Sequence, residues 1–188
     1  GDMPYKSFDE PRTAVKNARR FIEEAGCDAV KIEGECNEAS RAIIETGIPL
    51  MGHLGLTPQT ATEFKVQGKD VSTASDILNA ALRLDKLGCF SIVLECIPAE
   101  LASMITKKIA TPTIGIGAGC GCDGQILVLN DMLGLYDRFK PKFAKRYADL
   151  GKEALKAIEA FKGEVEAGLF PGDEHSFKIK KEELEKLT

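Results

Sequence analysis

Four charged side chains stand where short apolar runs of the sequence end. Asp2 lies beside the first residue, and Glu95 closes an apolar run. Lys31 and Glu33 alternate with apolar neighbours, so they share one face of a strand. A charge at the end of a buried strand is costly unless it is paired, metal-bound or functional. Each could pair with a neighbour or cap a helix, but four strand ends that meet at one rim favour a functional site.

These residue types fit one kind of chemistry. Asp2 and Glu33 are the hard oxygen ligands that magnesium prefers. Lys31 beside them would supply positive charge for a substrate carboxylate or enolate oxygen. Glu95 is the candidate general base. A metal that polarises a carbonyl, with a base next to it, suits removal of a proton adjacent to that carbonyl.

His53 and a glycine-rich stretch are weaker candidates. His53 lies on the same strand face as Met51. Its position fits a residue that lines the site and a hydrogen-bonded core residue equally well. Gly115, Gly117 and Gly119 lack the spacing of a dinucleotide fingerprint. Their missing side chains would leave room for a ligand beside the strands.

Short apolar runs alternate with amphipathic helical periods along most of the chain. The runs are rich in β-formers and occupy residues 29–34, 49–55, 91–96, 113–117 and 125–129, with residues 1–4 as the end of a further strand. Helices are predicted between them over residues 13–25, 37–45, 73–87 and 98–109. This alternation predicts parallel strands with crossover helices that cover them.

An open doubly wound sheet and a closed eight-stranded barrel both fit this alternation. The strands turn polar or small on one side near their carboxyl ends, which is typical of barrels with a site at that mouth. A barrel of eight units needs about 250 residues, so six strands are expected here. The prediction is a single barrel domain over residues 1–188, incomplete at its N-terminus, with a helical tail over about 140–188. In that tail, a surface helix is expected over 140–166 and a charged helical end over 178–188.

Composition excludes several classes of protein. The 188 residues carry 25 basic and 29 acidic side chains, a net charge of −4, and 44% of them are hydrophobic. Mild acidity argues against nucleic-acid binding, and no apolar run is long enough for a membrane span. No secretory signal is visible, and the six cysteines are expected to be reduced thiols. We therefore expect a cytoplasmic protein.

Nine motifs in a fixed order give the chain a specific resemblance. They are DMPY at residues 2–5, VKIEG at 30–34, MGHLGLTPQ at 51–59, LECIP at 94–98, IGIGAG at 114–119, CDGQ at 122–125, DMLG at 131–134, FPG at 170–172 and HSF at 175–177. With these motifs the chain closely resembles the ketopantoate hydroxymethyltransferase family over nearly its whole length.

The resemblance implies a (β/α)8 TIM barrel of the phosphoenolpyruvate/pyruvate superfamily, with about six of the eight strands in this chain. It implies a homo-oligomer that transfers a hydroxymethyl group from 5,10-methylenetetrahydrofolate to 3-methyl-2-oxobutanoate, giving 2-dehydropantoate for pantothenate and coenzyme A biosynthesis. Asp2 matches a magnesium ligand that also contacts the ketoacid, and Lys31 matches the lysine that binds it. Glu33 matches a second metal-site carboxylate, and Glu95 matches the proton acceptor.

The chain departs from the family pattern at its start. Family members begin with two more strand–helix units, and the second carries an Asp-Ser pair that completes the metal site. That pair is absent from these residues, so we expect the chain alone to bind magnesium and ketoacid weakly. Two alternatives stay open: a related ketoacid lyase or mutase of the superfamily, and a truncated, non-catalytic assembly subunit.

Overall fold

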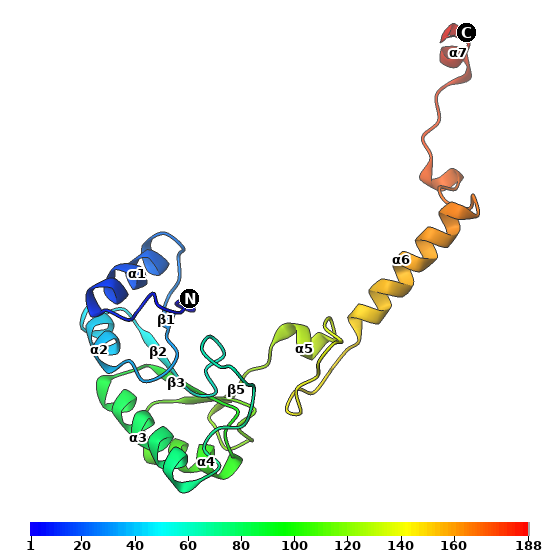
Figure 1. Cartoon of the computed structure of the whole chain (residues 1–188). Helices are drawn as coiled ribbons and strands as arrows, with labels where there is room; N and C mark the ends of the chain where they lie inside the picture. Colours follow the sequence, from blue (N-terminus) through cyan, green and yellow to red (C-terminus); the bar gives the residue numbers. More distant parts are fainter. Residues whose placement is uncertain (188) are drawn as a thin grey trace. The chain divides into compact units, whose positions relative to one another are not determined.

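The chain forms two compact units. The computed structural model describes residues 1–187, and the chain divides into Gly1–Leu127 and Val128–Thr188. Figure 1 shows strands and helices alternating in the first unit, whereas the second contains helices and loops. The number of domains stays a prediction, and each unit is described by itself.

The first unit is built on a parallel sheet whose strands follow one another in chain order. All neighbouring pairs are parallel, and the strands are β1 (Val30–Lys31), β2 (Leu50–Gly55), β3 (Ser91–Glu95), β4 (Thr113–Ile116) and β5 (Gly124–Gln125). Asp2 forms a further parallel bridge with Lys31. The backbone therefore enters the sheet at six places, as the sequence pattern predicted.

Four helices connect the strands and pack in sequence along the sheet (Figure 1). They are α1 (Pro11–Glu23), α2 (Asn37–Glu45), α3 (Val71–Leu87) and α4 (Ala99–Lys108), and each packs against the next. The longest, α3, begins where the Asp70 carboxylate accepts a hydrogen bond from Thr73 N at 2.9 Å. It ends at Gly88, whose φ of 90° is readily adopted only by glycine.

The core lies between these helices and the sheet. Ile43, Leu84 and Ile105 on the helices are fully buried, as are Ile92 and Leu94 on β3. The helices come close to the strands: a Cβ added at Gly52 of β2 would lie 2.7 Å from Leu84 Cδ1. Apolar packing thus fills the helix side of the sheet, which leaves its carboxyl rim for polar side chains.

Three predicted elements are wrong in their extent. The strand predicted over 29–34 is paired only at Val30–Lys31. The strand predicted over 125–129 is paired only at Gly124–Gln125, and α5 (Leu129–Leu133) begins at its last predicted residue. The helix predicted over 140–166 is α6 (Leu150–Glu166), so its first ten residues are not helical. Pro141 does not explain this difference, since proline is tolerated in the first turn of a helix.

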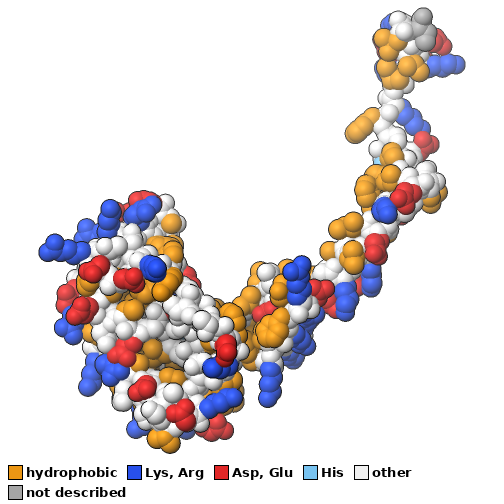
Figure 2. All heavy atoms as spheres, in the orientation of Figure 1, with side chains coloured by type: hydrophobic (Ala, Val, Ile, Leu, Met, Phe, Trp, Pro, Cys, Tyr) orange, Lys and Arg blue, Asp and Glu red, His pale blue; other side chains and the backbone are white. Residues whose placement is uncertain are grey.

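The second unit is helical and its apolar side chains are largely exposed. After α6 come η1 (Asp173–His175), α7 (Lys181–Leu184) and η2 (Glu185–Leu187), so a short helical end forms inside the predicted range 178–188. No residue of α6 is buried, and Figure 2 shows hydrophobic side chains at its surface. Among residues 1–187, no helix is long and apolar enough to cross a membrane.

Candidate functional site

The residues predicted to carry chemistry lie together at the carboxyl ends of neighbouring strands. Lys31 is the last residue of β1, and Asp2 forms its parallel bridge on the sheet edge. His53 lies within β2, and Glu95 ends β3 opposite Gly55. Glu33 lies just beyond β1, where Gly34 N donates to His53 O at 2.9 Å. The parallel register thus brings segments far apart in sequence to one rim.

Lys31 is the centre of this rim. Its Nζ lies 2.9 Å from Asp2 Oδ1, 3.7 Å from Glu33 Oε1 and 3.3 Å from His53 Nδ1. The Glu33 side chain is only 5% exposed, whereas that of Asp2 is 50% exposed. The ammonium therefore compensates the charge of one buried carboxylate and of one that faces solvent. A buried carboxylate requires such a partner.

His53 joins Lys31 to Glu95. The Lys31 ammonium can only donate, so His53 Nδ1 accepts and the ring proton of a neutral imidazole lies on Nε2. Nε2 lies 2.8 Å from Leu56 O and 3.3 Å from Glu95 Oε2. His53 is 4% exposed, so it is both a hydrogen-bonded buried residue and a neighbour of the candidate base.

The backbone after Glu95 is held in an uncommon conformation. Cys96 has a φ of 49°, in the left-handed region that few residues other than glycine adopt. Its N–H donates to Ile116 O at 2.9 Å, and its carbonyl accepts from Gln67 N at 2.8 Å. Burial, with a smaller contribution from the Glu95 charge, raises the pKa of the Cys96 thiol to about 11. The thiol beside the candidate base is therefore protonated at neutral pH.

Sequence reasoning missed Gln59, although this residue ends the MGHLGLTPQ motif. Its backbone N–H donates to Glu33 Oε2 at 3.0 Å, and its Nε2 donates to Asp2 Oδ1 at 3.3 Å. It lies 26 residues from Glu33 and 57 residues from Asp2, so no periodicity connects them. The available signal was its position in a Thr-Pro-Gln turn directly after a strand whose end carries site residues.

The donors at the rim fit magnesium in type, though they are few. No group of three His, Cys, Asp or Glu side chains within residues 1–187 is placed to hold a metal ion. Two carboxylates, Asp2 and Glu33, both pair with the Lys31 ammonium. Magnesium commonly takes one or two protein carboxylates and keeps waters or substrate oxygens as its other ligands. These two residues could therefore hold the ion together with such ligands.

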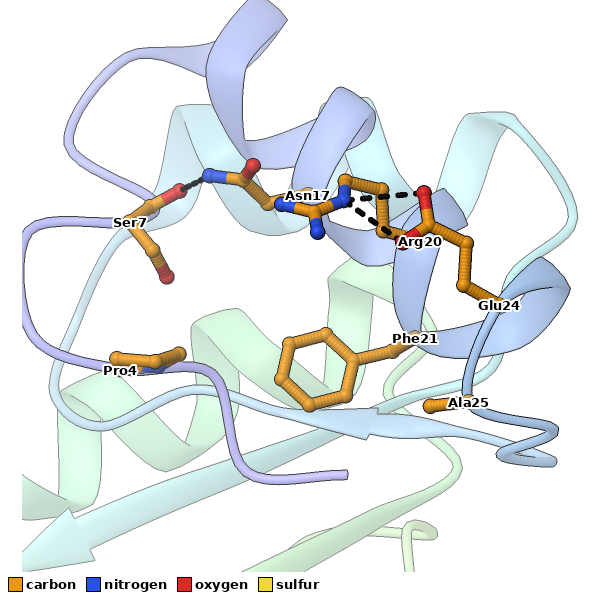
Figure 3. Close-up of a pocket in the computed structure, with 7 residues that line it drawn as sticks. All are labelled: Pro4, Ser7, Asn17, Arg20, Phe21, Glu24 and Ala25. Atoms are coloured by element: carbon orange, nitrogen blue, oxygen red, sulfur yellow. Dashed lines mark hydrogen bonds and ion pairs between the residues drawn. The ribbon is translucent and has the colours of Figure 1, made fainter.

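Two pockets near this edge do not contain the predicted residues. One, of about 600 Å³, lies between α1 and the segment after Asp2, where Pro4 and Phe21 face one another (Figure 3). Its polar groups bond among themselves, since Asn17 donates to Ser7 O and Arg20 pairs with Glu24. A smaller pocket, of about 230 Å³, is lined by the loop after β2. Neither is lined by the charged rim residues.

Comparison with known proteins gives a consistent result. Residues 1–173 match the family model described as ketopantoate hydroxymethyltransferase. A protein of Syntrophomonas wolfei named 3-methyl-2-oxobutanoate hydroxymethyltransferase is 52% identical, over 100% of this chain and 70% of that protein. Proteins of the same name from Desulfotalea psychrophila and Clostridium botulinum are 53% and 50% identical, over 94% and 99% of this chain and 66% and 70% of theirs.

The fold agrees with these similarities. The parallel sheet, with helices between consecutive strands, is part of the (β/α)8 barrel of the phosphoenolpyruvate/pyruvate superfamily. The relatives are named as transferases, and the chain spans about 70% of the length of the first of them. The chain therefore belongs to the ketopantoate hydroxymethyltransferase family.

Proposed function

We propose that the chain transfers a hydroxymethyl group from 5,10-methylenetetrahydrofolate to 3-methyl-2-oxobutanoate and so forms 2-dehydropantoate. The names of its relatives support this reaction, which belongs to pantothenate and coenzyme A biosynthesis. The proposal includes a homo-oligomer in the cytoplasm, with small-molecule substrates and no nucleic-acid or membrane partner. These further points follow from the family resemblance and the composition.

One observation carries the proposal: a continuous series of polar contacts runs from Asp2 to Glu95. Lys31 contacts Asp2, Glu33 and His53, and His53 contacts Glu95. The candidate base therefore lies two contacts away from the Lys31 ammonium and three from the carboxylates that pair with it. Such an arrangement suits the removal of a proton beside a carbonyl whose oxygens are held by charged groups.

The carboxylates and the lysine would bind the ketoacid. Asp2 and Glu33 would hold magnesium, which when bound polarises the keto oxygen and stabilises negative charge on it. Lys31 would bind the carboxylate of the ketoacid, and Asp2 would also contact this substrate. In the structure, the Lys31 ammonium already lies between the two carboxylates. Binding of the substrate therefore requires Lys31 to exchange at least one of these contacts for the ketoacid.

Glu95 would act as the base. Its carboxylate takes the proton from C3 of 3-methyl-2-oxobutanoate, and the electron pair of that C–H bond moves into the enolate. Water takes the methylene group from the folate as a formaldehyde equivalent, which breaks its bonds to the folate nitrogens and leaves tetrahydrofolate. The enolate carbon adds to the carbonyl carbon of that equivalent, and the resulting alkoxide takes the proton from the Glu95 carboxyl to become the hydroxyl of the product. The His53 Nε2–H, 3.3 Å from Glu95 Oε2, orients the carboxylate from the side of β2. Lys31 would oppose the charge that develops on the enolate oxygen.

Proton exchange tests the first half of this reaction without folate. We expect the chain with MgCl2 in D2O to exchange the C3 proton of 3-methyl-2-oxobutanoate, as followed by NMR. The variant E95Q should lose this exchange. We expect product only when methylenetetrahydrofolate is added. Cleavage of the ketoacid without folate would instead favour a lyase.

The activity of the chain by itself needs a separate measurement. We expect titration calorimetry to show weaker binding of magnesium and ketoacid than for a full-length relative. Equal affinity would contradict this expectation. If the isolated chain shows no exchange and co-purifies with a full-length relative, an assembly role is favoured, whereas exchange by the isolated chain excludes that alternative.

A further inference from the structure

The loop after β2 fastens the charged rim at three points. Leu56 N donates to Glu95 O at 2.9 Å, and Gln67 N donates to Cys96 O at 2.8 Å. Between these two anchors, Gln59 contacts the carboxylates of both Glu33 and Asp2. The loop therefore connects the end of β3 with the two carboxylates on the other side of Lys31.

Gln59 holds the two carboxylates with different groups. Its backbone N–H binds Glu33 Oε2 at 3.0 Å, and its side-chain Nε2 binds Asp2 Oδ1 at 3.3 Å. Nε2 also donates to Met3 O at 3.2 Å. One residue thus fixes the positions of a buried and a half-exposed carboxylate relative to each other.

The orientation of the Gln59 amide leaves its oxygen without a partner. Asp2 Oδ1 and Met3 O are both acceptors, so the amide must present its nitrogen to them. The oxygen, Oε1, is then buried, and it has no hydrogen-bond partner among the described residues. Most buried amide oxygens accept a hydrogen bond from the protein or from ordered water, so a donor is expected at this position.

We propose that Gln59 is a positioning residue that sets the Asp2 and Glu33 carboxylates to receive a hydrated divalent cation, and that Oε1 accepts a hydrogen bond from a water of that cation. This inference rests on the proposed function, because it concerns the same two carboxylates. It adds a residue that neither the sequence pattern nor the chemistry of the charged groups indicated. The ketoacid itself has no donor to offer Oε1, whereas a water bound to the cation has one.

Cation binding is the direct test, with Mn2+ alone as the probe and electron paramagnetic resonance as the readout. The variant Q59L removes both the amide N–H on Asp2 and the free oxygen, and it keeps the backbone N–H on Glu33. We expect its Mn2+ affinity to fall about tenfold, because hydrogen bonds to charged groups are lost. On a D2A background the same change should have a smaller effect, because only the contact of Oε1 is then left to lose.

Q67L is the matched control. Gln67 lies in the same loop, and within residues 1–187 its side chain donates to Lys65 O alone, at 3.0 Å. We expect Q67L to keep the Mn2+ affinity of the unmodified chain. Urea unfolding checks that each variant is folded. If Q59L does not fold, Q59M serves as a second variant without the amide.

The outcomes separate this inference from the proposed function. An unmodified chain that binds Mn2+, with Q59L binding it equally well, overturns the role of Gln59 alone. An equal loss in Q67L and Q59L also overturns it, because the loop as a whole would then be responsible. An unmodified chain that binds no Mn2+ overturns the cation role of Asp2 and Glu33, and the role of Gln59 falls with it.

Discussion

The charged rim and the apolar core of the first unit are stabilised in opposite ways. In the core, Leu84 and Ile92 are fully buried against other apolar side chains. At the rim, Glu33 is almost as deeply buried, but it depends on two specific polar partners, Lys31 and Gln59. Loss of a methyl group in the core leaves a cavity, whereas loss of one partner at the rim leaves a charge unpaired. The rim is therefore less tolerant of changes in chemistry, and the core is less tolerant of changes in volume.

The largest expected loss of stability tests the core half of this comparison. L84A removes the side chain that packs against Gly52 of β2, and we expect it to lower the free energy of unfolding by about 3 kcal/mol. L155A on α6 is the matched control, since Leu155 is 55% exposed and should matter little. Urea unfolding measures both variants. A similar loss in the two would contradict the assignment of Leu84 to the core.

A smaller loss is expected at the rim, and it should be reversible by a second change. K31M leaves the Glu33 carboxylate without its cation, and we expect a cost of about 2 kcal/mol together with loss of ketoacid binding. K31M/E33Q removes the unpaired charge and should recover part of the stability but none of the binding. Urea unfolding and calorimetry with 3-methyl-2-oxobutanoate distinguish the two effects. A double variant no more stable than K31M would show that the pair is not coupled.

A weaker, pH-dependent effect is expected where helix α3 meets the start of β4. Hydrogen bonds from the Thr111 hydroxyl, and from the N–H groups of Thr111 and Ala110, hold the pKa of Asp85 below its ordinary value. A group whose pKa is lower in the folded than in the unfolded state contributes stability at pH values above its unfolded-state pKa. This contribution is lost as the pH falls through its folded-state pKa. The variant D85N should therefore lose less stability than the unmodified chain between pH 7 and pH 3. Urea titrations at the two pH values measure this difference, and equal losses would contradict it.

The smallest effect is expected for an ion pair in full contact with water. Arg20, in the last turn of α1, pairs with Glu24, the residue directly after the helix, and both side chains are more than 60% exposed. The variant R20A should unfold at the same urea concentration as the unmodified chain, because exposed pairs contribute little. A clear shift would mean that Arg20 has a structural role in the pocket shown in Figure 3.

Sequence reasoning succeeded where one local pattern decides the structure. Period-two and helical spacing located the main strands and the four helices of the first unit, and the polar strand ends located the rim. It failed where a distant partner decides, and it made one helix too long. Gln59 acquires its contacts only when residues 57 positions apart are brought together, and α6 begins at Leu150, ten residues later than its composition indicated. Whether His53 is a core residue or part of the site depended on its contacts with Lys31 and Glu95, which lie on other strands.

Burial of the Cys96 thiol has a practical consequence for chemical labelling. Burial raises the pKa of the thiols of Cys89 and Cys96 to about 11, so almost none of either is the reactive thiolate at neutral pH. Cys120, in the glycine-rich loop after β4, is exposed. An alkylating reagent should therefore modify Cys120 well before Cys96, which would place a fluorophore or spin label on that loop while the residue next to Glu95 stays unmodified.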